Sequence, residues 1–218
     1  MPQHPLRILL LVAAVVFVVT FVQLGVLTIA LDKLGLSTDS AALLFITILI
    51  GSMLNLPLFS MDATAPKDAA PLPQIPGFPQ QPPFTGKTYV VANVGGCVIP
   101  VAFCIYLMRH NPLSYPHLLV GITAVTTISY LTTRRLAGIG FGIPILLAPL
   151  TAAMVSLALD PSHAAPLAYI SGTLGVLIGA DLLHLKDIRE LGIPLASIGG
   201  AGSFDGILIT GIVAALLA

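Results

Sequence analysis

Long apolar runs, each bounded by charged or helix-breaking residues, dominate the pattern along the chain. A bilayer core about 30 Å thick needs about 20 mostly apolar residues per helix, and runs of this length recur. We therefore expect an all-α, polytopic integral membrane protein with about seven transmembrane helices, several of them kinked or broken, in one membrane domain over residues 1–218. The predicted helices lie near residues 7–31, 40–59, 88–108, 114–133, 137–159, 164–185 and 194–217.

Composition agrees with a lipid environment. Apolar residues make up 56% of the chain and charged residues only 8%, against about 25% charged in an ordinary soluble domain. Membrane lipids are therefore the expected surroundings. Nine basic and nine acidic residues balance and form no basic stripe, so we do not expect a nucleic-acid partner.

The distribution of Lys and Arg predicts the orientation. Of these residues, seven fall on the same side of the predicted membrane as the N-terminus, and only Lys33 and Arg109 fall on the other. Because basic residues are retained in cytoplasmic loops, we expect a prokaryotic inner-membrane protein with its N-terminus in the cytoplasm and its C-terminus on the outer side.

A proline-rich segment interrupts the pattern between the second and third predicted helices. Residues 60–87 contain seven prolines between Ala65 and Phe84, too many for a helix or a sheet, so we expect a polyproline-like cytoplasmic loop. Its simplest interpretation is a stiff linker, and the alternative is a ligand for a proline-recognising partner protein.

Asp181 and Asp205 are the only acidic residues inside the predicted helices. A charge in the hydrocarbon core costs about 2.5–3.5 kcal/mol on insertion scales, so it persists mainly beside a partner or a water-filled cavity. We take the two aspartates as the candidate catalytic pair. The alternative is that each carboxylate satisfies nearby hydroxyl or backbone donors in a helix interface.

The depths of the two aspartates set a condition on this pair. A last helix beginning at Pro194 would put Asp205 about 17 Å along it, whereas Asp181 would lie only about 6 Å from the end of its own helix. The glycines around Asp205 permit an unwound entry instead. A helix beginning near Ser203 would bring the carboxylates to one level, so the prediction requires unwinding between Ile198 and Ser203.

Other polar residues could line the same cavity. Asn55 and Asn93 each stand near a proline that frees a backbone carbonyl, and we leave open whether they join helices or line the cavity. His184 follows Asp181 by three residues; it either relays a proton to that carboxylate or is an interfacial histidine. Thr173 lies in a glycine repeat that more often indicates close helix packing. The candidate binding residues are Asn55, Asn93, Thr173, His184, Gly200, Gly202 and Gly206.

No zinc-binding spacing, phosphate loop or cysteine pair at ligand distance occurs in the sequence, so we predict neither a metal nor a cofactor. The two cysteines are expected to be small buried core residues.

Four stretches resemble a family of prokaryotic multi-pass membrane proteins, the domain of unknown function numbered sixteen-fourteen. The stretches are Gly51–Leu58, Asn93–Pro100, Tyr169–Leu183 and Ser197–Ile207. The resemblance extends over nearly the whole chain and supports the choice of residues without implying a reaction.

The last part of the chain is also similar to intramembrane aspartyl proteases of the presenilin, signal-peptide-peptidase and prepilin-peptidase type. These enzymes carry two membrane aspartates on different helices, one after a Gly-x-Gly turn. Here Gly200-Ala-Gly202 precedes Asp205, with Asp181 one helix earlier. The sequence departs from the pattern because two residues separate the turn from the aspartate and no Pro-Ala-Leu follows.

Three functions follow as hypotheses. The first is a protease-like enzyme in which Asp181 and Asp205 activate water against a transmembrane peptide. The second is a proton- or cation-coupled transporter or channel for a small solute, built on broken helices. The third is a non-catalytic accessory or assembly subunit of a membrane complex.

Overall fold

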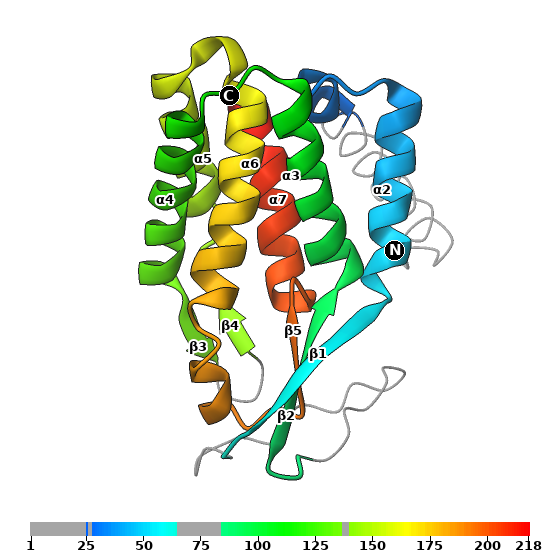
Figure 1. The fold of residues 1–218 in the computed structure, drawn as a ribbon, viewed down its shortest axis with the longest axis vertical. Helices are drawn as coiled ribbons and strands as arrows, with labels where there is room; N and C mark the ends of the chain where they lie inside the picture. Colours follow the sequence, from blue (N-terminus) through cyan, green and yellow to red (C-terminus); the bar gives the residue numbers. More distant parts are fainter. Residues whose placement is uncertain (1–24, 26–27, 65–83, 137–139) are drawn as a thin grey trace, which may run out of the picture.

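The computed structural model describes residues 25, 28–64, 84–136 and 140–218, and for residues 136, 140, 201–206 and 208 it describes the main chain alone. Helices form an upright bundle, and a small sheet extends from its lower end (Figure 1). The first predicted membrane helix lies mostly outside the described residues, as does most of the proline-rich loop.

Six α-helices with described bounds form the bundle, and residues 28–33 are helical as well. The six are α2 (Thr38–Ser52), α3 (Ile99–His110), α4 (Tyr115–Thr132), α5 (Leu147–Leu159), α6 (Ala164–Val176) and α7 (Ala201–Leu217). The π-helix η1 (Val94–Val98) leads into α3, and the π-helix η3 (Leu177–Leu182) continues α6; the short 3-10 helices η2 (Pro161–His163) and η4 (Asp187–Glu190) lie in connections. Helices α2, α4 and α6 run downward in Figure 1, and α3, α5 and α7 run upward.

The main sheet has the order β1-β2-β5, with β1 at Asn55–Asp62, β2 at Lys87–Asn93 and β5 at Leu195–Ile198. Strands β1 and β2 are antiparallel, and β2 and β5 are parallel. A second antiparallel pair, β3 (Arg134–Leu136) and β4 (Gly140–Gly142), follows α4. The sheet therefore joins segments that lie far apart in the sequence.

These strands correct the all-α expectation, although the chain is mostly helical. The predicted helices at 40–59, 88–108 and 194–217 each contain a strand next to a helix, and the one at 137–159 becomes a helix only at Leu147. An apolar run has the same hydropathy in either conformation, so its length alone could not separate them. The β-branched and aromatic residues from Thr88 to Val91 favour the extended form.

Helix α6 occupies the centre of the bundle and packs against α3, α4, α5 and α7. Glycines bring its neighbours close: a Cβ added to Gly175 would lie 2.5 Å from the side chain of Val125, and one added to Gly179 would lie 2.4 Å from the carbonyl oxygen of Thr126. The interpretation of the glycine repeat as a close-packing surface is thereby confirmed.

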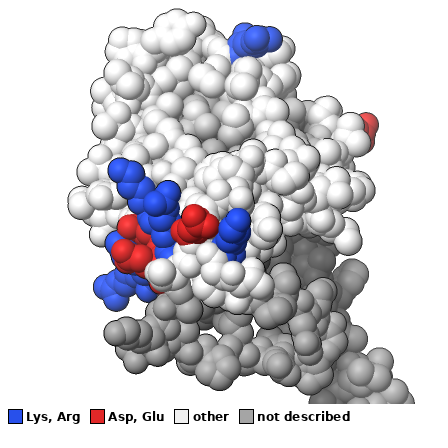
Figure 2. Space-filling view, turned by 60° about the horizontal axis from the view of Figure 1, so that its bottom comes forward, with Lys and Arg blue, Asp and Glu red and all other residues white. Residues whose placement is uncertain are grey.

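Charged side chains lie at the two ends of the bundle. One end carries Asp32, Lys33, Asp39, Arg109 and Asp160; the other carries Asp62, Lys87, Arg134, Arg135, Lys186, Asp187, Arg189 and Glu190. Figure 2 shows the second group gathered at the end that bears the strands, and few charges on the helices above it. Among the side chains that the structure describes, Asp181 is the one charged group between the two ends.

One continuous helix, Pro161–Leu182, is long and apolar enough to cross a membrane, and 78% of its apolar window is buried inside the protein. The apolar helices Thr38–Ser52, Val94–His110 and Leu147–Leu159 are shorter. These helices all lie within the described residues. A buried core helix of a soluble protein can have the same length and composition.

Candidate functional site

Three strand–helix junctions lie side by side at the lower end of the bundle. Asn55 begins β1 just after α2, Asn93 ends β2 just before η1, and β5 ends at Ile198 just before α7. The register pairs Asn55 with Asn93, and Ala92 with Ile198. Segments that the sequence separates by more than a hundred residues therefore meet at one level, which we call the junction layer.

Asn93 is the most connected side chain of the junction layer, and it is only 4% exposed. Its Oδ1 accepts a hydrogen bond from the Gly96 N–H at 2.8 Å and so caps the start of η1. Its Nδ2 donates to the Ser52 carbonyl at 2.7 Å and to Asn55 Oδ1 at 3.1 Å. A single amide thus ties the end of α2 to the start of the segment that leads into α3.

The amide of Asn55 continues this network toward the third junction. Its Oδ1 also accepts a hydrogen bond from Ser197 Oγ at 3.0 Å. An amide oxygen has two lone pairs, so Asn93 and Ser197 occupy both acceptor positions of Asn55. The structure thus brings Asn55 and Asn93 together in contacts that join elements of the fold.

Asp181 lies on η3 at the same level and is 7% exposed. Its Oδ2 accepts a hydrogen bond from the Gly199 N–H at 2.9 Å. The π-helical turn adds a residue relative to an α-helix and re-aims the side chains that it carries, and such turns occur frequently at functional sites. The carboxylate is therefore directed at the turn between β5 and α7.

Gly199 is suited to that turn for two reasons. Its φ of +68° lies in the left-handed region, which side chains other than glycine rarely adopt. A Cβ at this position would also lie 2.6 Å from the Gly96 carbonyl carbon and 2.8 Å from the Cys97 nitrogen. The absence of a side chain lets the β5–α7 turn touch the start of η1.

The chain is unwound between Ile198 and Ala201, where α7 begins. The predicted break is present, and the helix starts two residues before the expected Ser203. Asp205 is the fifth residue of α7, so its main chain lies about 6 Å along the helix axis from the first residue. The side chain of Asp205 lies outside the described residues, as do the surroundings of Gly202 and Gly206. Gly200 precedes the helix, and its N–H donates to the Ser197 carbonyl at 3.0 Å.

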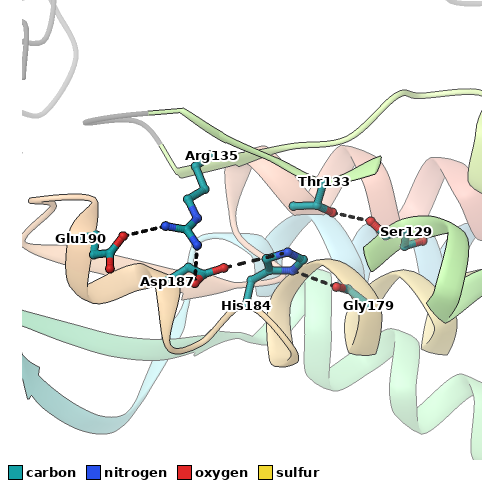
Figure 3. A network of polar contacts seen from close by, with 7 residues as sticks. All are labelled: Ser129, Thr133, Arg135, Gly179, His184, Asp187 and Glu190. Carbon is teal, nitrogen blue, oxygen red and sulfur yellow. Dashed lines mark hydrogen bonds and ion pairs between the residues drawn. The ribbon is translucent and has the colours of Figure 1, made fainter. Parts of the chain in front are cut away.

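His184 points into a second polar network, at the lower end of α6 (Figure 3). Its Nδ1 lies 3.0 Å from the Gly179 carbonyl oxygen, and its Nε2 lies 4.0 Å from Asp187 Oδ2. Arg135 binds Asp187 at 2.7 Å and Glu190 at 2.6 Å. The contacts of His184 therefore connect the π-helix to charged groups on the surface, and its predicted proton relay to Asp181 stays a prediction.

Thr173 lies apart from the junction layer. It precedes Asp181 by eight residues, which is about 12 Å along a helix, and it is fully buried. A Cβ added to Gly211 of α7 would lie 2.6 Å from Thr173 Oγ1, so Thr173 contacts α7 where that helix packs on α6. Within the described part of the chain, no three His, Cys, Asp or Glu residues approach closely enough to hold a metal ion.

Several residues of these networks were not among the predicted site residues: Ser52, Gly96, Ser197, Gly199, Arg135, Asp187 and Glu190. The Gly-Gly pairs at 95–96 and 199–200 were a usable signal, because adjacent glycines mark close approaches of main chain. The ion pairs had no such signal in the sequence, because more than fifty residues separate Arg135 from Asp187 and Glu190.

Comparisons with known proteins identify a family without a described activity. No curated protein and no solved structure matches the chain. The sequence model of a family described as "protein of unknown function (DUF1614)" matches residues 49–217, a region that includes the junction layer and the His184 network. The chain belongs to this DUF1614 family.

Proposed function

We propose that the protein is a polytopic membrane protein with the strand-bearing end in the cytoplasm. Large apolar side chains on the outer faces of the helices support this: Leu43 is 67% exposed, Leu119 68%, Leu131 70% and Met154 69%. Water would be a poor solvent for such a surface. Charged side chains lie at the two ends of the bundle and leave the helices between them apolar, and Figure 2 shows those of the strand-bearing end gathered together.

The orientation follows from the described basic residues. Five of them, Lys87, Arg134, Arg135, Lys186 and Arg189, lie at the strand-bearing end, while Lys33 and Arg109 lie at the other. The positive-inside rule assigns the first end to the cytoplasm. Labelling of single cysteines placed at Arg134 and Arg109 with a membrane-impermeant maleimide in spheroplasts should modify only the position at Arg109. Labelling only at the position of Arg134 would show that the strand-bearing end faces outward, which contradicts the proposed orientation.

We further propose that the junction layer is the site of an intramembrane aspartyl protease-like enzyme, with Asp181 and Asp205 as its catalytic carboxyl groups. The observation that carries this proposal is the unwound segment before α7, whose Gly199 N–H binds Asp181. Asp181 therefore contacts the chain six residues before Asp205. A shared site requires the Asp205 side chain to reach this contact from the fifth residue of α7.

The chemistry needs two carboxyl groups that share one proton, because two adjacent charges are costly in a medium of low dielectric constant. The ionised carboxylate would accept a proton from water as its oxygen attacks the carbonyl carbon of the peptide bond. The protonated carboxyl group would donate its proton to the amide nitrogen as the C–N bond breaks. The products are a carboxylic acid and an amine, and no oxidant or reductant is needed.

Cleavage of membrane-anchored peptides by the purified protein tests this proposal. We expect products from the wild-type protein and none from Asp181→Ala or Asp205→Ala. Asp39→Ala serves as the matched control, because it removes an exposed aspartate at the far end of the bundle and should leave cleavage unchanged. A panel of peptides that yields no aspartate-dependent product would contradict the enzyme proposal.

A cation-coupled transporter is the second candidate, and the interruptions of helix structure at η1, η3 and the start of α7 favour it. The hydrogen bonds of Asn55 count against a cation site at that residue, since its amide oxygen already accepts donors from Asn93 and Ser197. Uptake into proteoliposomes that depends on sodium or pH and is lost in Asp181→Asn would support transport.

A further inference from the structure

His184 closes the last turn of the helix that carries Asp181. At this point the backbone forms a π-type bond from the Leu183 N–H to the Ile178 carbonyl, at 2.9 Å. The next carbonyl, that of Gly179, instead faces the imidazole of His184, whose Nδ1 lies 3.0 Å away. A carbonyl oxygen only accepts, so Nδ1 carries the proton in this contact. The side chain thus satisfies a carbonyl that the end of the helix would leave without a donor.

The imidazole is held in this orientation from several sides. Its ring lies 4.8 Å from the ring of Tyr130 on α4 and 5.4 Å from the ring of Phe141 on β4. Its Nε2 faces Asp187, which Arg135 holds by an ion pair. His184 is only 8% exposed. Figure 3 shows the ring between the surface charges and the π-helix.

We propose that His184 is a positioning residue: it holds the π-helical turn in the geometry that directs Asp181 at Gly199. Gly179 and Asp181 belong to the same π-helix, only two residues apart. If the turn reverted to α-helical bonding, the side chains after it would rotate about the helix axis, and the Asp181 carboxylate would lose the Gly199 N–H. The importance of this position for catalysis rests on the proposed function, but the contact itself does not.

Amide hydrogen exchange at Gly199 measures this contact directly. In ¹⁵N-glycine-labelled protein in detergent micelles, His184→Ala should accelerate exchange at Gly199 by roughly fivefold, the ratio expected when one hydrogen bond of ordinary strength is lost. Gly96 provides an internal control in the same sample, because its N–H binds Asn93 and should exchange at the wild-type rate.

Two conservative variants separate positioning from simple packing. In His184→Asn the side-chain nitrogen lies where Nδ1 lies, so the Gly179 contact and slow exchange at Gly199 should be restored. In His184→Gln the nitrogen lies nearer to Nε2, so exchange should stay fast. Arg135→Ala, at a half-exposed site, leaves His184 in place but frees Asp187, and should accelerate exchange by about twofold, less than the loss of a complete hydrogen bond.

Unchanged exchange at Gly199 in folded His184→Ala, or equal acceleration in His184→Asn and His184→Gln, would overturn the proposal. If His184→Ala does not fold, the comparison of the Asn and Gln variants decides by the same criterion. The exchange measurement involves no substrate, so it can succeed even where the peptide-cleavage assay fails. In that case the protease proposal falls and the positioning role of His184 stands.

Discussion

The packed helices α4, α5 and α6 and the junction layer are stabilised in different ways. Glycines let α4 and α6 approach closely, and the buried hydroxyls of Ser129, Ser156 and Ser171 on the three helices have no hydrogen-bond partner among the described residues. In the junction layer, Asn93 alone makes three hydrogen bonds to three chain segments. Close packing therefore holds the first region, whereas directed polar contacts hold the second.

The difference indicates where the chain can carry chemistry. The packed helices keep their backbone donors and acceptors in hydrogen bonds within each helix. The junction layer interrupts helices at three places and exposes backbone donors to side chains, as Gly199 does to Asp181. A site that binds and releases protons needs such donors, so the interruptions are the more suitable place for it.

The largest effect should follow from a Cβ at the contact between α2 and η1. A Cβ on Gly95 would lie 2.1 Å from the Ile48 carbonyl oxygen and 2.4 Å from the Ser52 nitrogen, both main-chain atoms. Because the main chain cannot give way without breaking the junction layer, we expect Gly95→Ala to cost about 3 kcal/mol or more of unfolding free energy. Denaturant titration in mixed micelles measures this cost. Gly172→Ala meets a side-chain methyl group at 3.0 Å and should cost clearly less; equal costs would contradict the prediction.

Removal of the Asn93 amide should have the next largest effect. Asn93→Ala deletes three hydrogen bonds and leaves the Gly96 N–H without its acceptor, so we expect a loss of about 2–3 kcal/mol in the same titration. Asn93→Asp retains an acceptor for Gly96 but loses both donors. Its second carboxylate oxygen would face the Ser52 carbonyl and Asn55 Oδ1, both acceptors, so its loss of stability should be at least as large as that of Asn93→Ala. A loss in Asn93→Ala below 1 kcal/mol, about the value of a single bond, would contradict the proposed role of Asn93.

Arg135→Ala should change the overall stability only slightly. The guanidinium group binds Asp187 and Glu190, but its side chain is 50% exposed, and exposed ion pairs contribute about 0–1 kcal/mol. We expect a loss within this range that decreases further at high salt. A loss several times larger, independent of salt, would show that the surface cluster holds the fold and does not merely orient His184.

The smallest effect is expected among the packed helices. Ser171→Ala removes a buried hydroxyl that has no partner among the described residues, so the unfolding free energy should change by less than about 0.5 kcal/mol in either direction. Ser197→Ala, in the junction layer, removes a hydroxyl that donates to Asn55 and is the matched comparison. It should lose about 1 kcal/mol, and a reversed order would contradict the contrast between the regions.

Much of the helical content was predictable because apolar runs and their breaks are local properties of the chain. The glycine repeat in α6 predicted close packing, and the glycines before Asp205 predicted a break where the structure has one. The strands were not predicted. Residues 88–93 continue an apolar run into η1 and α3, so hydropathy alone merged a strand with the helix that follows it.

The sequence by itself determined that the chain is mostly apolar and helical, that Asp181 and Asp205 are the only acidic residues inside its long apolar runs, and that glycine interrupts these runs at defined points. Only the tertiary structure decided which interruptions meet. The pairing of β1, β2 and β5 brings Asn55, Asn93 and Ser197 together. The carboxylate of Asp181 accepts a hydrogen bond from a turn eighteen residues later in the chain. Hydrogen bonds are short and directional, so their partners depend on the arrangement of the whole chain and not on local composition.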